Sequence, residues 1–392
     1  MNARSLVKIP CVYMRGGTSK GLIINENDLP RDAKIRDQVI LKIYGSPNPW
    51  QIDGIGGGSP TTSKLALVRK SEQEDIDIVY TFGQVSVTEE IIDYKPTCGN
   101  MAAAVGLYAV EEGFCKIKEP YTVVRIFNTN ANKIIEVEVP VKNGAVVYDG
   151  DFSISGVPGT ASKINVNFLD SGGAITGKVL PTGNIKDKVS LSSGKIVEVS
   201  VVDSANTIIF VKADQVDIEG TEVGKDFNKK ELLDRLEEIR TIVGKQIGLI
   251  SPNDNPSPFT HALPKICVIA KPRDYVSSEK QIISADDIHI IGRYLAMGTL
   301  HPAFAVSGAI ALATASQIPG TVVHDMLVDH KGPIKIGHPT GIIEVEATVI
   351  EENGEYRVQR AAIGRTARRI MEGYSFVPAS LFNGAVTRLE QD

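Results

Sequence analysis

Apolar and polar residues alternate along several short segments of the chain. In "NKIIEVEVPV" at 132–141 and "TGIIEVEATV" at 340–349, isoleucine or valine alternates with glutamate, which is the period of a half-buried strand. Turns of glycine, proline and asparagine separate segments of this kind. The pattern therefore predicts a protein that is made mainly of short strands.

Two segments have the period of a helix instead. Residues 31–45 and 228–244 each carry an apolar stripe, with charged residues on the opposite face. The stripe positions are Ile35, Val39 and Ile43 in the first segment, and Leu232, Leu236, Ile239 and Val243 in the second. Asn228 and Glu231 are spaced like a capping box at the start of the second helix. Both helices are expected to cover the outside of the molecule, away from the active site.

Segments of the first half resemble segments of the second half, in the same order along the chain. The pairs are 12–25 with 198–211, 98–110 with 301–313, and 132–141 with 340–349. Three matches in one order predict an internal repeat. We therefore expect an α+β fold of two similar domains, 1–180 and 181–392, each with many strands around a central helix of small residues. If the domains face each other, the N-termini of both central helices point into one cleft and favour an anion there.

Composition narrows the class of protein. The 392 residues carry a formal net charge of −5, and 42% of them are hydrophobic, which is typical of a soluble globular protein without a basic surface for nucleic acid. No run of 18 apolar residues is present, and the N-terminal segment lacks the apolar core of a signal peptide. The four cysteines, at positions 11, 98, 115 and 267, form no CxxC pair. We expect free thiols in a cytoplasmic protein with no membrane or nucleic-acid partner.

Cys98 stands where the segment "KPTCGNMAAAVG" at 95–106 is predicted to enter a helix. Pro96 and Thr97 favour an extended entry, and the alanine run after Asn100 favours a helix. A thiol at a helix N-terminus lies in a positive field that favours the thiolate, and Gly99 leaves space above the helix end. Cys98 is therefore a candidate reactive group, with a buried structural cysteine as the alternative.

The segment "RGGTSK" at 15–20 is predicted to be a turn between two strands. Its glycines expose backbone N–H groups, the hydroxyls of Thr18 and Ser19 can donate, and Arg15 can bind a carboxylate with two hydrogen bonds. The lysine and the hydroxyl residues do not have the order of a phosphate-binding loop. A plain glycine turn with solvated charges is the alternative.

The segment "DGIGGGSPTTSKLALV" at 53–68 places many donors just before an apolar strand. Its glycine spacing is not GxGxxG, so no dinucleotide site is expected. Lys64 opens the strand, where burial would lower the pKa of its side chain and make it a base. A surface lysine at a strand end is the alternative.

Two histidines of the second half follow glycine-containing turns, His301 in 298–303 and His338 in 337–341. Each could orient or protonate a carboxylate, and each could equally be a hydrogen-bonded structural residue. Their spacing fits no zinc pattern, and the chain has no GxSxG nucleophile elbow. No metal ion or nucleotide cofactor is expected.

Three long motifs together resemble the PrpF family, which includes 2-methylaconitate isomerases and 3-methylitaconate Δ-isomerases. The motifs are "YMRGGTSKG" at 13–21, "QIDGIGGGSPTTSK" at 51–64 and "CGNMAAAVG" at 98–106. The resemblance continues through "TGKVLPTG" at 176–183 and "HPAFAVSGAIA" at 301–311, and so covers most of the chain.

The resemblance implies a fold like that of diaminopimelate epimerase: two domains, each a strand barrel around a central helix, with the active site between them. In those epimerases two cysteines face each other across the cleft. Cys98 matches the first, but the second copy reads His301-Pro302-Ala303-Phe304 at the corresponding place, so a symmetric two-cysteine racemase is not expected. The family pattern implies a lysine instead, and Lys64 matches it.

The implied reaction is a cofactor-free allylic isomerisation of an unsaturated di- or tricarboxylate. A base removes a proton from the carbon γ to a carboxylate, and an acid returns one at the α carbon. Donors at two helix ends would stabilise the extra negative charge of the intermediate. Cys98 and Lys64 are the expected acid/base pair. The expected substrate-binding residues are Arg15, Gly17, Thr18, Ser19, Ser63, Asn100 and Ser307.

Other functions stay open at this point. Relatives of the family tautomerise 4-oxalomesaconate or isomerise aconitate. A non-catalytic protein that binds a carboxylate and assists a methylcitrate dehydratase would keep the glycine, serine and threonine cradle without needing Cys98. The expected partner is a small carboxylate substrate, and a homo-oligomer formed through outer strands is compatible with the sequence.

Overall fold

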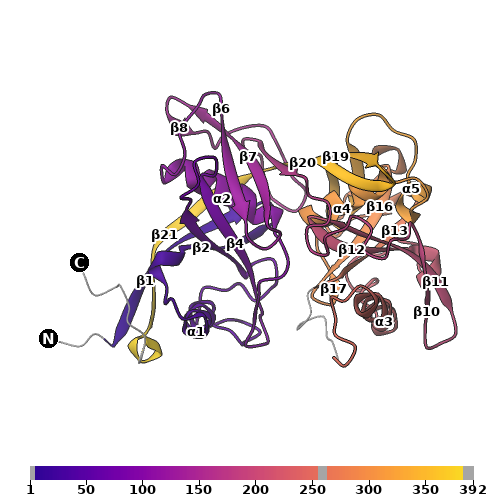
Figure 1. Ribbon diagram of the computed structural model, residues 1–392, viewed down its shortest axis with the longest axis horizontal. Helices are drawn as coiled ribbons and strands as arrows, with labels where there is room; N and C mark the ends of the chain where they lie inside the picture. The colour runs from indigo at the N-terminus through magenta and orange to yellow at the C-terminus, as the bar shows by residue number, and fades with distance from the viewer. Residues whose placement is uncertain (1–4, 255–262, 383–392) are drawn as a thin grey trace.

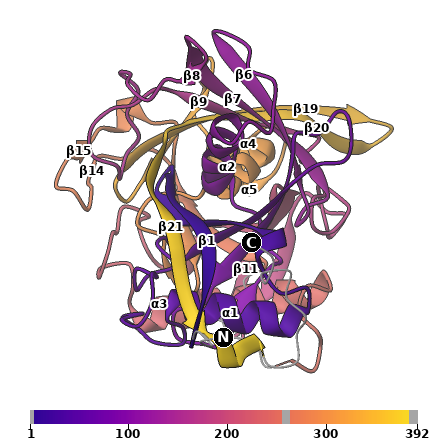
Figure 2. The same ribbon diagram turned by 90° about the vertical axis from the view of Figure 1, so that its left-hand side faces the viewer.

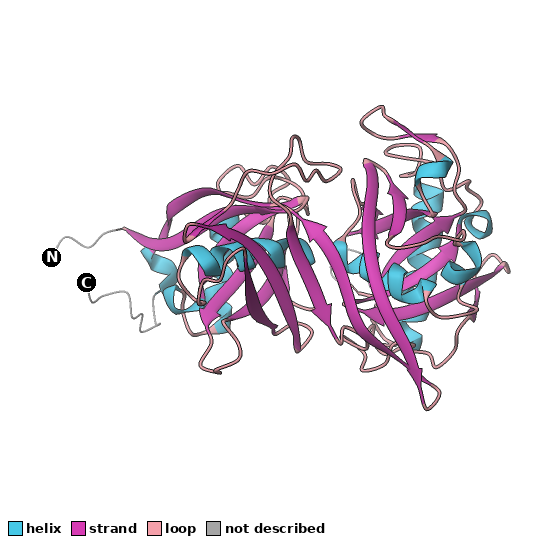
Figure 3. Cartoon of the chain, turned by 90° about the horizontal axis from the view of Figure 1, so that it is seen from above, coloured by secondary structure: helices cyan, strands magenta, loops and turns pink. Residues whose placement is uncertain are grey.

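The computed structural model describes residues 5–254 and 263–382. It has two lobes, and each lobe is a curved sheet that encloses a helix (Figures 1 and 3). The strands before residue 170 are β1 (Leu6–Gly16), β2 (Ser19–Asn25), β3 (Lys64–Lys70), β4 (Ile78–Val85), β5 (Ile92–Asp93), β6 (Tyr121–Asn128), β7 (Lys133–Lys142), β8 (Ala145–Val146) and β9 (Ile164–Leu169). The later strands are β10 (Asp187–Ser190), β11 (Ile196–Ser204), β12 (Asn206–Lys212), β13 (Lys265–Ala270), β14 (Tyr275–Val276), β15 (Ile282–Ile283), β16 (Ile290–Ala296), β17 (Thr299–Leu300), β18 (Ile334–His338), β19 (Gly341–Glu352), β20 (Glu355–Arg365) and β21 (Ala367–Pro378).

Helices are few, so the fold is α+β as the sequence predicts. The α-helices are α1 (Ala33–Tyr44), α2 (Gly99–Glu111), α3 (Lys230–Gln246), α4 (Val306–Ser316) and α5 (Val322–Met326). Short 3-10 turns are η1 (Glu26–Asp28), η2 (Ala213–Val216), η3 (Ala285–Asp287) and η4 (Ala379–Phe382). No helix of residues 5–254 and 263–382 is long and apolar enough to cross a membrane.

Strand order and orientation follow the same scheme in both lobes. In the first lobe β1–β2 is antiparallel, β2–β3 parallel, β3–β4 antiparallel, β4–β6 parallel and β6–β7 antiparallel. In the second lobe β11–β12 is antiparallel, β12–β13 parallel, β13–β16 antiparallel, β16–β18 parallel and β18–β19 antiparallel. This common order is what an internal repeat predicts, and the repeat itself stays our interpretation.

The last strands of the chain return to the first lobe. β19 pairs with β18 of the second lobe through its first residues and with β20 through its later ones, so it connects the two lobes. β20 then pairs with β9, and β21 lies antiparallel to β1 along its whole length (Figure 1). The division into domains 1–180 and 181–392 stays a proposal. Residues 355–378 belong to the second of these domains by sequence, but they lie in the sheet of the first lobe.

The central helices α2 and α4 are buried because they are apolar or small on every face. α2 is enclosed by strands of the first lobe (Figure 2), and α4 packs against β11, β12 and β19. Gly106 of α2 is needed for this packing, since a Cβ there would lie 2.5 Å from Val137 Cγ1 of β7. The two helices belong to one continuous apolar core.

The outer helices α1 and α3 lie on the outside of the sheets, as their one-sided apolar stripes predict. Val39 and Ile43 of α1 and Leu236 of α3 are buried. The predicted capping box of α3 is wrong. Its N-cap is Lys229, with no side-chain cap bond, and the side chain of Asn228 instead accepts a hydrogen bond from Leu300 N at 3.0 Å, which ties the helix to the β17 turn.

The predicted match between 98–110 and 301–313 is displaced by four residues. α2 begins directly after Cys98, whereas α4 begins directly after Ala305 rather than after His301. Measured from the helix starts, Cys98 corresponds to Ala305, and Asn100 corresponds to Ser307. His301 lies before the helix, in the turn that follows β17.

Candidate active site

A pocket of about 50 Å³ lies where the N-termini of α2 and α4 meet. Cys98, Gly99 and Asn100 line it from α2, and Ala305, Val306 and Ser307 line it from α4. The two helix ends touch, because a Cβ on Gly99 would lie 2.4 Å from Val306 Cγ1. Neither N-cap residue makes a side-chain cap bond, so the first-turn N–H groups of both helices lack that partner. Two uncapped helix N-termini at one pocket favour an anion.

Lys64 and Cys98, the predicted acid/base pair, line this same pocket. Lys64 is the first residue of β3 and is held between Gly21 of β2 and Gln84 of β4. Its ammonium donates to Gln84 Oε1 and lies 5.3 Å from the ring centre of Phe82. Burial lowers the pKa of Lys64, and the charge of the Cys98 thiolate opposes this effect. The two groups are therefore close enough to influence each other electrostatically.

Asn100, Thr18 and Ser19 form a hydrogen-bonded group on the first-lobe side. Asn100 Nδ2 donates to Thr18 Oγ1 at 3.1 Å and to Ser19 Oγ at 3.2 Å. Arg365 Nε donates to Asn100 Oδ1 at 3.0 Å and so fixes the orientation of the amide. Because both hydroxyls accept from Asn100, each keeps its own hydrogen for another acceptor, such as a carboxylate.

Ser307 is held in the same way on the second-lobe side. Asn206 Nδ2 donates to Ser307 Oγ at 2.8 Å, and the Ser307 hydroxyl also forms a side-chain hydrogen bond with Tyr294. Asn206 Oδ1 accepts from Thr97 N at 3.0 Å, and Thr97 Oγ1 donates to Ala205 O at 2.7 Å. The residue before Cys98 is thus fastened to the second lobe, and the thiol is positioned by both halves.

His301 lines the pocket as a neutral hydrogen-bond donor. Its Nδ1 accepts from Ala303 N at 3.0 Å, so the ring proton is on Nε2. Burial, with the charge of Lys64 in second place, lowers the pKa of His301 to about 4. His338 lies in the neighbouring cleft rather than in this pocket.

Three predicted substrate-binding residues line neither this pocket nor the neighbouring cleft. Arg15 Nη1 donates to Gly17 O at 2.9 Å and to Thr366 Oγ1 at 3.0 Å, which ties the β1–β2 turn to the β20–β21 turn. Gly17 has a φ of +49° and packs against Asn100, where a Cβ would lie 2.0 Å from Oδ1. Ser63 is buried and donates to Gln51 Oε1 at 2.7 Å. These residues support the loops around the pocket.

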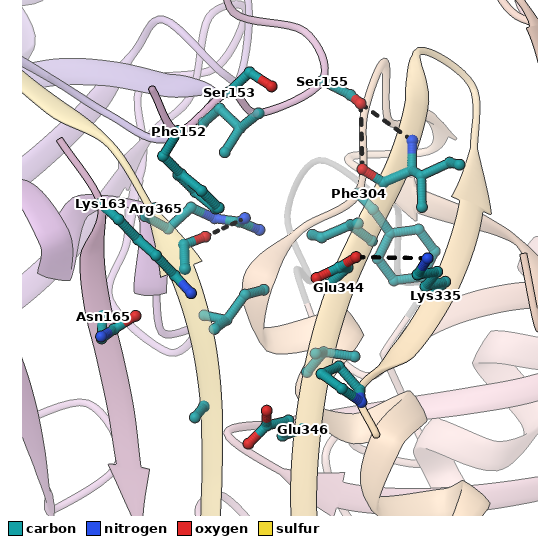
Figure 4. Close-up of a pocket in the computed structure, with 18 of the residues that line it drawn as sticks. Phe152, Ser153, Ser155, Lys163, Asn165, Phe304, Lys335, Glu344, Glu346 and Arg365 are labelled. Carbon is teal, nitrogen blue, oxygen red and sulfur yellow. Dashed lines mark hydrogen bonds and ion pairs between the residues drawn. The ribbon is translucent and has the colours of Figure 1, made fainter. Parts of the chain in front are cut away.

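A larger cleft of about 720 Å³ lies beside the pocket, between the two lobes (Figure 4). Thr18 and Arg365 line it from the first lobe, and Lys335 and His338 line it from the second. Ser155 spans the two walls, since Ile342 N donates to its Oγ at 3.1 Å. The Thr18–Ser19 turn separates the two cavities, with Thr18 in the cleft and Ser19 in the pocket.

Sequence reasoning missed Arg365 and Lys265 at these cavities. Arg365 lies in an ordinary strand pattern with no local signal. Lys265 opens the apolar segment "KICVIA", just as Lys64 opens "KLALV", and this likeness was the available signal. In the described part of the chain, no group of three His, Cys, Asp or Glu side chains is placed to hold a metal ion.

Comparison with known proteins assigns the family. The family model described as "PrpF protein" matches residues 6–378. The chain belongs to the PrpF family. It is 46% identical over 375 residues to a 3-methylitaconate isomerase of Eubacterium barkeri, which covers 95% of this chain and 97% of that one. It is also 35% identical over 387 residues to a 2-methyl-aconitate isomerase of Shewanella oneidensis, which covers 95% of this chain and 97% of that one.

Solved structures agree with the fold expected for a PrpF protein. The crystal structure of a methylitaconate Δ-isomerase is 44% identical, with a TM-score of 0.79 over 96% of this chain and 97% of that one. A hydroxyproline epimerase of Agrobacterium vitis is only 11% identical, with a TM-score of 0.58 over 97% of this chain and 93% of that one. The second likeness shows the fold alone, which is the diaminopimelate-epimerase-like fold.

Proposed function

We propose that this PrpF protein is a cofactor-independent isomerase that moves or rotates the double bond of an unsaturated di- or tricarboxylate. The relatives named above act, by their names, on 3-methylitaconate and 2-methylaconitate, and substrates of this type are proposed here. The observation that carries the proposal is that Lys64 and Cys98 line one pocket where two uncapped helix N-termini meet.

The chemistry needs two proton transfers across a three-carbon allyl unit. One member of the Cys98–Lys64 pair takes the allylic proton, and the electron pair left behind spreads over the allyl carbons and the attached carboxylate. The other member then delivers a proton to the far carbon, and the double bond has moved. For a cis–trans change, the delocalised intermediate rotates before it is reprotonated. The lowered pKa of Lys64 suits this task, since burial disfavours its ammonium form.

Stabilising the carboxylate charge is the main task of the surrounding donors. The hydroxyls of Thr18 and Ser19 are oriented toward an external acceptor by Asn100, and Arg365 adds a positive charge beside them. One such preorganised donor is typically worth about 2.7–4 kcal/mol in the transition state. We place one carboxylate at this group, with the allyl carbons of the substrate in the pocket beside Lys64 and Cys98.

The test is proton NMR of the purified protein in D₂O with 3-methylitaconate, 2-methylaconitate and 4-oxalomesaconate, each in a separate sample. We expect one acid to be isomerised with incorporation of one deuterium per turnover. Cys98→Ser and Lys64→Gln should each abolish this exchange, while Cys115→Ser and Lys70→Gln should retain it. Cys115 is the other half-buried thiol, and Lys70 is the exposed lysine at the far end of β3, so both are matched controls.

An accessory protein that only binds a carboxylate is the competing function. It predicts saturable binding of the acids without deuterium incorporation, and full binding by Cys98→Ser. Exchange that survives in both Cys98→Ser and Lys64→Gln would also contradict the proposed pair, because the reaction would then depend on other groups.

A further inference from the structure

Lys265 in the second lobe is placed as Lys64 is placed in the first. Lys64 is the first residue of β3, and its strand runs parallel to β2, with Gly21 opposite Lys64. Lys265 is the first residue of β13, and its strand runs parallel to β12, with Ile208 opposite Lys265. Each lysine therefore stands at the start of a strand that runs parallel to its neighbour, and both lysines line the pocket.

The two lysines differ in their partners. The residue opposite Lys64 on β4 is Gln84, which accepts a hydrogen bond from the Lys64 ammonium. On β16, the register that pairs Cys267 with Tyr294 places Ala296 opposite Lys265, and an alanine side chain cannot accept a hydrogen bond. Over residues 5–254 and 263–382, the Lys265 ammonium has no hydrogen-bond or ion-pair partner.

The charged groups around Lys265 come from three elements. Asp93 of β5 favours its ammonium form, while Lys64 of β3 and Arg240 of α3 disfavour it. Burial is the largest effect, and together they lower the pKa of Lys265 to about 7. Cys98 and His301 share the pocket with it. An anion that binds here would therefore supply the partner that the Lys265 ammonium lacks and would keep Lys265 in its charged form.

We propose that Lys265 binds a second carboxylate of the substrate, at the α4 end of the pocket. The first-turn N–H groups of α4, beside Ser307, complete this subsite. Ser19 and the first-turn N–H groups of α2 hold the other carboxylate at the α2 end of the pocket, while Thr18 and Arg365 contact Asn100 from the cleft side. The site thus requires two carboxylates, one for each helix end, with the allyl carbons between them beside Lys64 and Cys98. The identity of the substrate rests on the proposed function, whereas the need for two carboxylates rests on the geometry of the pocket.

The experiment measures the binding of two saturated probes that cannot be isomerised, 2,3-dimethylsuccinate and its monocarboxylate counterpart 2,3-dimethylbutyrate. Isothermal titration calorimetry compares the wild type with Lys265→Gln, with Lys265→Arg and with Lys271→Gln, the exposed lysine just beyond β13. We expect Lys265→Gln to weaken the dicarboxylate by roughly 10- to 100-fold while leaving the monocarboxylate unchanged. Lys265→Arg should restore part of the affinity, and Lys271→Gln should match the wild type.

Proton uptake gives a second readout that a purely structural role would not change. At pH 8, binding of 2,3-dimethylsuccinate should draw a proton onto Lys265, so the apparent binding enthalpy of the wild type should depend on the ionisation enthalpy of the buffer. This dependence should be smaller in Lys265→Gln and unchanged in Lys271→Gln. Asp93→Asn is the control for a role of Lys265 as a charge partner of Asp93 instead of a substrate ligand. If Lys265 only served Asp93, Asp93→Asn and Lys265→Gln would lose the same thermal stability, and neither would change the affinity for 2,3-dimethylsuccinate.

The outcomes distinguish this inference from the proposed function. If Lys265→Gln binds both probes as the wild type does, or weakens both equally, the second subsite is wrong, whatever the enzyme does to unsaturated acids. If the wild type fails to bind 2,3-dimethylsuccinate, the subsite is also wrong. If binding depends on Lys265 but no unsaturated acid exchanges protons in D₂O, the subsite stands and the isomerase assignment fails.

Discussion

Arg365 donates from Nε to Oδ1 of Asn100 at 3.0 Å, and so joins the strand β20 near the end of the chain to the first turn of α2 (Figure 4 shows Arg365 at the cleft). Within residues 5–254 and 263–382 the guanidinium pairs with no carboxylate, although it is buried. Burial lowers the pKa of Arg365 to about 9, with the Cys98 thiolate opposing this shift. A buried cation without an acidic partner beside a pocket is suited to bind an anion.

We expect Arg365→Gln to lower kcat/KM by about 10²-fold, because it removes both the charge and the bond that orients Asn100. Arg365→Lys should recover little, since an ammonium cannot reproduce the guanidinium fork. Steady-state kinetics with the acid that is identified by NMR provides the measurement. Arg368→Gln, an exposed neighbour, is the control, and equal kinetics in Arg365→Gln and Arg368→Gln would contradict the role.

Local patterns predicted much of the fold and selected the proposed acid/base pair. The alternation in 132–141 and 340–349 became β7 and β19, and the helix expected after Cys98 begins directly after that residue. Motif likeness to the PrpF family selected Lys64, whose strand-end position alone was ambiguous. These features depend on residues that are close together in the sequence, where periodicity and helix propensity carry the information.

Contacts between distant segments could not be predicted in the same way. Arg15 had the chemistry of a carboxylate ligand, but the return of β21 beside β1 gives it Thr366 as a partner. Arg365 has no local signal, and its place at the cleft depends on β20 crossing back to the first lobe. The start of α4 was misplaced because Ala303 and Ala305 fit a small-residue helix as well as the true helix does.

Cys98 should be the thiol that iodoacetamide modifies first. It is half-buried and lines the pocket, whereas Cys11 and Cys267 are buried, and burial raises the pKa of the Cys115 thiol to about 11. Mass spectrometry after brief alkylation should find one main adduct on Cys98, and 2,3-dimethylsuccinate should slow its formation. Cys98→Ser should lose that adduct. Modification of Cys115 at the same rate would show that pocket position does not govern reactivity.

Gly99→Ala should lower both stability and activity. The added methyl group would lie 2.4 Å from Val306 Cγ1 and 2.7 Å from Phe168 Cζ, so the two helix ends would have to separate. Overpacking of this kind typically costs about 1–3 kcal/mol, and here it would also misplace Cys98. Urea unfolding and kinetics check the change. The double variant Gly99→Ala with Val306→Ala should recover part of both losses, and purely additive effects would show that this contact is not responsible.

Acid should destabilise the protein partly through His338, whose pKa burial lowers to about 3. The unfolded chain binds this proton near pH 6.5 but the folded chain does not, so the stability contributed by neutral His338 is complete above pH 6.5 and is lost as the pH falls from there. At about 1.36 kcal/mol per pH unit, lowering the pH from 8 to 5 should cost about 2 kcal/mol through this residue.

Urea unfolding of the wild type and of His338→Gln at pH 8, 6 and 5 measures the difference. Glutamine keeps an acceptor for Thr340 N, which donates to the ring Nδ1 at 3.3 Å. His338→Gln should therefore lose less stability than the wild type on acidification, and His324→Gln, at an exposed histidine, should follow the wild type. Parallel pH curves for the wild type and His338→Gln would mean that the folded protein already binds a proton at His338 at pH 5.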